Sequence, residues 1–390
     1  MKKHAALFAL GFRPFFIGAS IFAIISMSLW FSIYLFQLPL AFNTLTYTQW
    51  HGHEMIYGYG IAVIAGFLLT AIKNWTGIQT LHGKPLMGLF SLWVMARFLL
   101  ILGDHYLILA GFLDCGFIFL LGIAASKPII QVKQWRQLLL LLLLSLLIIG
   151  NILFYLGGLT QDTNLINISL YGGLYLIIGL ITVLSRRVVP FFIERGVGYP
   201  ITLFNHQLLD ASIIITLLGF LIFDQLLTNT LFSSIFSGLL FFGYSIRLIG
   251  WHTHGIWKNP LLWSLYLSLW SIALGFLLFS IMPYFNISKS IALHTFAIGG
   301  IGLMTLGMMA RISLGHTGRN IHQDLPHIMK IGFYSLLLAM IVRVILPLAW
   351  PTHYLLWIVS AQILWIIAFA IFAISYIPIL SRPRIDNLPG

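Results

Sequence analysis

The chain has 390 residues, of which 60% are hydrophobic and only 8% are charged. Soluble globular domains carry about 25% charged residues, so this composition excludes a soluble protein and predicts an all-α, polytopic membrane helix bundle. The formal charge of +12 does not indicate nucleic-acid binding, because the basic residues fall in short loops between apolar runs rather than on a soluble face.

The N-terminus, Met1-Lys2-Lys3-His4, resembles the start of a signal peptide. The apolar run that follows is long enough to cross a bilayer and is not followed by a small-residue cleavage site, so we expect a retained first helix. The one cysteine, Cys115, excludes an internal disulfide framework and any multi-cysteine metal or iron–sulfur site within one chain.

About twelve apolar runs of spanning length follow one another along the chain. No soluble domain, linker or low-complexity segment separates them, so we expect a single membrane domain over residues 1–390. The predicted spans are 14–37, 52–73, 86–103, 106–125, 137–159, 166–185, 205–223, 226–250, 260–282, 290–312, 328–350 and 353–379.

Basic residues predict the orientation of these spans. A cytoplasmic N-terminus places nearly all Lys and Arg on the cytoplasmic side, with Lys289 as the clear exception. An even number of spans then returns the C-terminus to the same side. The topology predicted is therefore N-in and C-in, with residues 50–55 on the outer side.

The second span opens with Trp50-His51-Gly52-His53-Glu54-Met55. Imidazoles at a membrane rim that face another helix are typical ligands of haem or copper. On a regular helix His51 and His53 are about 200° apart, so both meet one metal only if His51 still lies in the loop. Glu54 shares a helical face with His51. The alternative is an interfacial cluster with Trp50 and no ligand role.

His294 holds the matching place in the tenth span. His53 is followed 23 residues later by Thr76-Gly77, and His294 is followed 23 residues later by Thr317-Gly318. That length covers about 35 Å of helix, or one membrane thickness, so both histidines are expected at the outer rim. Chance matching of two glycine-rich helices is the alternative to a repeat, as is a lone histidine that only hydrogen-bonds a neighbouring helix.

Three further places carry polar groups. Arg97 and Asp114 fall inside consecutive spans, where an uncompensated charge is costly, so we expect them to pair. Arg343, in the outer half of its span, either meets a haem propionate or snorkels to the interface. His316 lies at an inner helix end in Gly315-His316-Thr317-Gly318-Arg319, where glycines allow close approach of a ligand.

Six motifs recur along most of the chain: Gly11 to Phe16, Trp50 to Met55, Gly66 to Ala71 with Asn74 to Gly77, Val189 to Phe192, His294 and Arg311 to Arg319. Together these motifs resemble the NnrS family of haem- and copper-containing membrane proteins of the bacterial nitric-oxide response, although Tyr266 stands where family members often have a histidine. The resemblance implies about twelve spans in the bacterial inner membrane, a haem, a copper and a role in tolerance of nitric oxide, without a settled reaction.

We therefore expect His53 and His294 to be the axial ligands of one b-type haem between the second and tenth spans, with Arg343 on a propionate. His51 with Glu54 is the first choice for copper and His316 the second. Partners are the bilayer and nitric oxide or a related small molecule, while the electron donor and any catalysed redox reaction stay open.

The alternative is a transporter of a small anion or metal complex, with histidines lining its path. A transporter is expected to show broken helices and polar groups at the midplane. Apart from Arg97 and Asp114, the polar groups of this chain concentrate at the two rims.

The sixth span has no histidine, so the binuclear centre of haem-copper oxidases is not expected.

Overall fold

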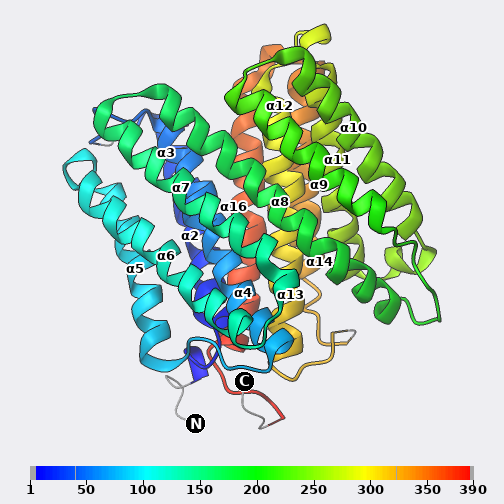
Figure 1. Cartoon of the computed structure of the whole chain (residues 1–390). Coiled ribbons are helices and arrows are strands. Elements are labelled where there is room, and N and C mark those ends of the chain that lie inside the picture. The colour runs from blue at the N-terminus through cyan, green and yellow to red at the C-terminus, as the bar shows by residue number, and fades with distance from the viewer. Residues whose placement is uncertain (1–5, 40, 322, 387–390) are drawn as a thin grey trace. The chain divides into compact units, whose positions relative to one another are not determined.

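The computed structural model describes residues 6–39, 41–321 and 323–386, and these residues fold into helices (Figure 1). Twelve helical segments among them are long and apolar enough to cross a membrane, which confirms the predicted fold class. The segments are Phe12–Phe36, Tyr47–Thr76, Gly83–Ile101, Asp104–Gln131, Trp135–Thr160, Thr163–Gly196, Gln207–Leu226, Thr230–Trp251, Pro260–Phe285, Lys289–His316, Met329–Ala349 and Pro351–Leu380.

Helix ends differ most from the prediction at the end of the sixth span, followed by the end of the fourth span, at Gln131 rather than residue 125, and the start of the second. The second begins with α3 (Tyr47–His53), five residues before the predicted start at residue 52. A capping box explains this early start: the Thr46 hydroxyl accepts from Gln49 N at 3.2 Å, and the Gln49 side chain accepts from Thr46 N at 2.8 Å. His51 therefore lies inside a helix, and the alternative in which it stays in the loop is wrong.

The sixth span, α8 (Thr163–Gly196), continues well past its predicted end at residue 185. Arg186 and Arg187 lie within this helix rather than in a loop, and the helix runs on through Pro190. A prediction from hydropathy ends the span at the first pair of charged residues. The helix itself continues, because long charged side chains can extend into water at the membrane surface while the backbone stays helical.

Two compact units are distinguished by their internal contacts. Unit 1 comprises Met1–Leu176, Met309–Pro326 and Phe369–Gly390, and unit 2 comprises Ile177–Met308 and His327–Ala368. The boundary falls inside three helices, α8, α13 (Leu303–His316) and α16 (Tyr354–Leu380). This division does not test the single membrane domain expected from the sequence, which remains a prediction.

Unit 1 is built from helices that are neighbours in sequence. The helix α2 (Phe12–Phe36) packs on α4 (Ile61–Thr76). Figure 1 shows α5 (Gly83–Ile101), α6 (Leu107–Gln131) and α7 (Leu138–Thr160) side by side, and α6 contacts both of the others. Short loops account for this arrangement, because they leave antiparallel neighbours little choice of partner.

Unit 2 follows the same rule. The helices α9 (Gln207–Leu221), α10 (Thr230–Trp251) and α11 (Pro260–Phe285) pack in sequence order. After α11 comes α12 (Lys289–His294), and α14 (Met329–Met340) packs against the segment that follows α12. The remaining short helix, α15, covers Leu346–Ala349.

Two of the π-helical segments begin directly after His53 and His294. The segment η1 (Glu54–Gly60) follows His53, and η6 (Thr295–Gly302) follows His294. Each returns to α-helix and ends near a left-handed glycine, Gly77 with φ 72° and Gly318 with φ 78°. The sequence echo is thus also an echo of backbone structure. π-helical turns are rare and occur often at functional sites, but Ile222–Leu226 and Ile341–Ile345 are π-helical as well, so it is a histidine directly before the π-helix that His53 and His294 share.

Candidate cofactor sites

His53 lies fully buried in unit 1, with both ring nitrogens at hydrogen-bond distance from oxygens. Nδ1 is 2.9 Å from Oε1 of Glu54, and Nε2 is 2.9 Å from Oδ1 of Asn151 and 3.4 Å from Oδ2 of Asp114. The ring stacks on Phe154 with 4.0 Å between ring centroids. The histidine is therefore held on its edge by polar groups and on one face by an aromatic ring.

Arg97 completes a buried charge network around this histidine. Its guanidinium, on α5, pairs with the carboxylates of Glu54 and Asp114. The Tyr155 hydroxyl donates to Oδ2 of Asp114 at 3.0 Å. Asp114, Glu54 and Arg97 are all almost fully buried, and four consecutive spans contribute to the network. We call these residues, with His53 and Asn151, the unit 1 charge network. The predicted pairing of Arg97 with Asp114 is confirmed.

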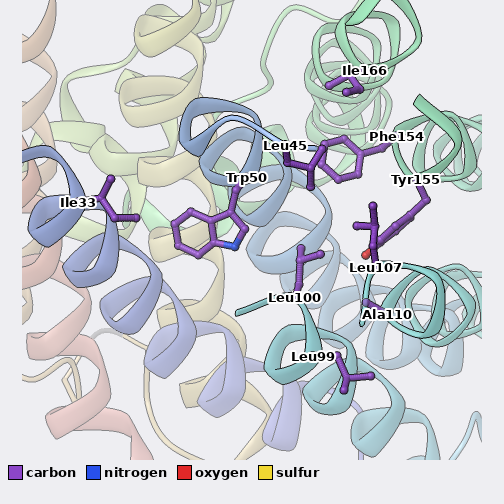
Figure 2. Packing of buried hydrophobic residues seen from close by; sticks show 10 residues of the cluster. All are labelled: Ile33, Leu45, Trp50, Leu99, Leu100, Leu107, Ala110, Phe154, Tyr155 and Ile166. Carbon is purple, nitrogen blue, oxygen red and sulfur yellow. The ribbon is translucent and has the colours of Figure 1, made fainter. Parts of the chain in front are cut away.

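An apolar cluster lies beside this network. Figure 2 shows Trp50 of α3 with Phe154 and Tyr155 of α7 among its ten buried residues. Tyr155 belongs to both groups, since its ring packs in the cluster and its hydroxyl reaches Asp114. Surrounding apolar side chains keep the charges away from lipid, and low polarity there strengthens the ion pairs.

Glu54 is placed differently from the sequence expectation, which grouped it with His51. Its Oε1 is engaged by His53 and Arg97 instead. His51 lies half-buried against α2, and its ring stacks on Trp30 at 4.7 Å with an interplanar angle of 7°. Helical rotation therefore turns His51 and His53 toward different neighbours, and they do not converge on one metal within unit 1.

His294 has surroundings of another kind, in unit 2. Its Nδ1 lies 2.7 Å from the backbone carbonyl of Ser290, one helical turn earlier. A carbonyl accepts only, so Nδ1 carries the hydrogen and Nε2 the lone pair. Arg343 is buried and donates from Nη2 to the Ser290 hydroxyl at 3.1 Å. Its guanidinium lies 5.7 Å from the ring centroid of Tyr354. One serine thus joins the two residues that the sequence assigned to a haem.

His316 occupies the other end of unit 1, since Asn74 near the end of α4 contacts it. The Asn74 amide nitrogen is 3.3 Å from Nε2 of His316, and the ring centroid of Phe12 is 5.6 Å away. His53 stands near the start of the same span, Tyr47–Thr76. The second choice for copper is therefore far along the helix from the first.

A haem or copper ligand must present a lone pair to the metal, and this requirement separates the histidines. At His294 the Ser290 carbonyl accepts from Nδ1 and so selects the tautomer with the lone pair on Nε2, an arrangement common in metal-ligating histidines. His53 does not fit as it lies, since Glu54 and Asn151 engage its two nitrogens. Among the described residues, no group of three or more His, Cys, Asp or Glu side chains is arranged to hold a metal ion.

Comparison with known families agrees with this sequence and architecture. A family model described as NnrS protein matches residues 6–384, nearly the whole chain. The chain belongs to the NnrS family. No curated protein matches it. The resemblance predicted from the motifs is confirmed, and both histidine segments, the unit 1 charge network and His316 all fall inside the matched region.

Proposed function

We propose that this NnrS-family protein binds haem and copper in the bacterial inner membrane and protects the cell from nitric oxide or related species. Family membership supports the class of function, and the site in unit 2 supports the chemistry. The single observation that carries the proposal is the hydrogen bond from His294 Nδ1 to the Ser290 carbonyl, with Arg343 on the same serine. This hydrogen bond fixes the orientation and the tautomer of the imidazole, with Nε2 on the metal-ligating side, directly before a π-helix.

In this proposal His294 supplies an axial ligand and Arg343 binds a propionate carboxylate. A guanidinium suits that task because its planar donors match a carboxylate. When bound, haem supplies an iron centre that nitric oxide can reach as a ligand. Gly299 and Gly300 of η6 let α11 approach, since an added Cβ would lie 2.7 Å from Ser271 Cβ or 2.8 Å from Ile272 Cγ1.

The other predicted ligands have unequal support. His51 stays our first choice for copper and His316 the second. The geometry of unit 1 favours His53 and Glu54 as members of the charge network rather than as ligands, because their polar atoms are engaged with Arg97 and Asn151. The pairing of His53 with His294 across one haem remains a prediction that only ligand variants decide.

The test uses the purified full chain and its His294→Ala and His53→Ala variants, with His252→Ala as the control, since His252 lies at the C-terminal end of α10. We expect a Soret band in the parent, loss of most of the haem in His294→Ala, and full haem content in His252→Ala, measured as the pyridine haemochrome. Loss of haem in a folded His53→Ala variant would restore the bis-histidine prediction. A His294→Ala protein with unchanged haem content and spectrum would refute the ligand proposed here.

The biological role is tested separately. Deleting the gene is expected to slow growth under nitric-oxide donors and to leave aerobic respiration intact. Unaltered donor sensitivity would contradict the proposed protection even if haem is bound, so the two parts of the proposal fail independently.

A second candidate function is transport of a small anion or metal complex, and one observation favours it. The unit 1 charge network places Glu54, Arg97 and Asp114 inside membrane spans, where ionisable groups commonly mark the paths of ions. A purified protein without any Soret band, together with loss of solute uptake in the deletion strain, would favour transport over cofactor binding.

A further inference from the structure

Four basic side chains gather around His316, at the end of unit 1 away from His53. The positive charges of Arg319 and Arg384 act on Arg13, and those of Arg384, Lys73 and Arg13 act on His316. The carboxylate in contact with this group is Asp386, which binds the guanidinium of Arg384 at 2.5 Å. Counted over Arg13, Lys73, Arg319, Arg384 and Asp386, all within the described part of the chain, four positive charges against one negative leave a surplus of three.

A C-terminal segment, residues 381–386, is fastened across this basic group, and we call it the strap. Nη1 of Arg13 donates to the carbonyls of Leu380 at 2.8 Å and Arg382 at 2.6 Å. Nη1 of Arg384 donates to the carbonyl of His316 at 3.2 Å, and Ile385 N donates to the Thr317 carbonyl at 3.2 Å. These bonds use the Arg13-Pro14 and His316-Thr317 motifs, which the haem proposal leaves unexplained.

Near the strap, two guanidinium donors lack an acceptor among the described residues. Arg13 is only 1% exposed, and its Nε is buried without a hydrogen-bond partner among the described residues. The same holds for Nη1 of Arg319 within the part of the chain that the structure describes. The end of α13 does not require these donors, because Arg319 N already bonds the Leu314 carbonyl at 3.0 Å. Buried donors on charged groups are costly to leave unmatched.

We propose that this end of unit 1 binds a phosphate group between Arg13, which holds the strap, and Arg319. A tetrahedral oxyanion offers several acceptors to guanidinium donors that arrive from different elements. The surplus of three positive charges favours a doubly charged anion over a singly charged one such as nitrate. Free phosphate and the headgroup of a phospholipid present the same chemistry, and the inner surface of the membrane supplies both.

Arg319→Gln is the decisive variant, because it removes a side-chain donor while the backbone N–H that ends α13 stays. Arg13→Gln is less informative, since it also releases the strap. Arg382→Gln is the matched control: it makes the same charge change in the strap, at an exposed side chain. Each protein is purified as the full chain in detergent, and its unfolding temperature is recorded as a check of folding that does not depend on haem.

Two measurements distinguish the sources of phosphate. Calorimetric titration with inorganic phosphate reports a free anion, and native mass spectrometry reports phospholipid retained after delipidation. We expect binding by one of these routes in the parent and in Arg382→Gln, and a loss of roughly tenfold or more in Arg319→Gln, since one charge-assisted hydrogen bond is at stake. The proposed phosphate site would be refuted if the parent bound neither phosphate nor phospholipid. It would also be refuted if the parent, Arg319→Gln and Arg382→Gln bound equally.

Discussion

The segments that carry His53 and His294 have the same backbone and opposite surroundings. In both, a π-helix follows the histidine and a left-handed glycine follows the α-helix after it. His53 is fully buried among two carboxylates, an amide and Phe154, whereas His294 is held by a backbone carbonyl. Two histidines at equivalent positions in their helices therefore differ in chemistry, because their hydrogen-bond partners differ.

The ion pairs of the two regions also differ in their burial. In unit 1 one guanidinium is shared between two buried carboxylates, so removal of any partner leaves charge inside an apolar surround. In unit 2 the ion pair nearest in sequence to His294 joins Lys289, 32% exposed in its side chain, to Asp224. Buried pairs are costly to break, while partly exposed pairs contribute little. The predictions that follow test this difference, from the largest effect to the smallest.

Arg97→Gln is expected to produce the largest loss. It leaves Glu54 and Asp114 buried without their cationic partner, which costs about 3–5 kcal/mol in comparable cases. Cys115, the one cysteine in the sequence and the neighbour of Asp114 on α6, reports the outcome. Thermal unfolding followed by a thiol-reactive dye is expected to shift to clearly lower temperature in the variant.

Arg343→Gln serves as the matched control in unit 2. Arg343 is also buried, but its contacts include a neutral serine hydroxyl rather than a pair of carboxylates. Labelling of Cys115 is therefore expected to follow the parent. Equal unfolding temperatures for Arg97→Gln and the parent would show that the unit 1 charge network does not stabilise unit 1.

A pair of adjacent glycines in α8 tests the packing of η1 by itself. A Cβ added to Gly173 would lie 2.6 Å from the Tyr57 hydroxyl, which donates to the Ser169 carbonyl, and 3.0 Å from Ile56 Cγ2. A Cβ added to Gly172 would meet nothing within 4 Å. Gly173→Ala is expected to destabilise by about 1–3 kcal/mol through overpacking.

Gly172→Ala is expected to be neutral or to stabilise by up to about 1 kcal/mol, because alanine favours a helix over glycine. Both variants are compared by thermal unfolding with the Cys115 reporter. Similar effects of the two substitutions would mean that Tyr57 is not the constraint on η1.

Hydropathy was sufficient to predict the twelve spans, because an apolar segment in a bilayer has to form a helix. It placed the start of the second span late, since the polar capping box at Thr46 carries no hydropathy signal. The same error left open whether His51 lies in a loop. Hydropathy therefore predicts which segments form spans more accurately than it predicts where each span begins and ends.

The candidate sites were predicted only in part. The pairing of Arg97 with Asp114 follows from the cost of an isolated charge in lipid, and that signal was present in the sequence. Glu54 was missed as the third partner because residues were compared along one helix, while its partner Arg97 lies on another. No residue pattern predicts a π-helix, so η1 and η6 are visible only in the backbone of the structure.

Lys289→Gln is expected to give the smallest effect, although it also removes one partner of an ion pair. Nζ of Lys289 lies 2.9 Å from Oδ2 of Asp224, and the Asp224 carboxylate also accepts from Gln225 Nε2 at 2.5 Å. Water already reaches the ammonium group, so loss of the pair is expected to cost about 1 kcal/mol or less.

Salt provides the check on this last difference. At roughly 1 M salt the screening length falls to about 3 Å, so the parent is expected to lose most of its advantage over Lys289→Gln in thermal unfolding. The deficit of Arg97→Gln is expected to persist at the same salt concentration, because ions do not enter a fully buried network. A Lys289→Gln deficit as large as that of Arg97→Gln, and equally insensitive to salt, would remove the distinction between the two histidine segments. A small, screened deficit would instead place the charge that stabilises the fold in the unit 1 charge network.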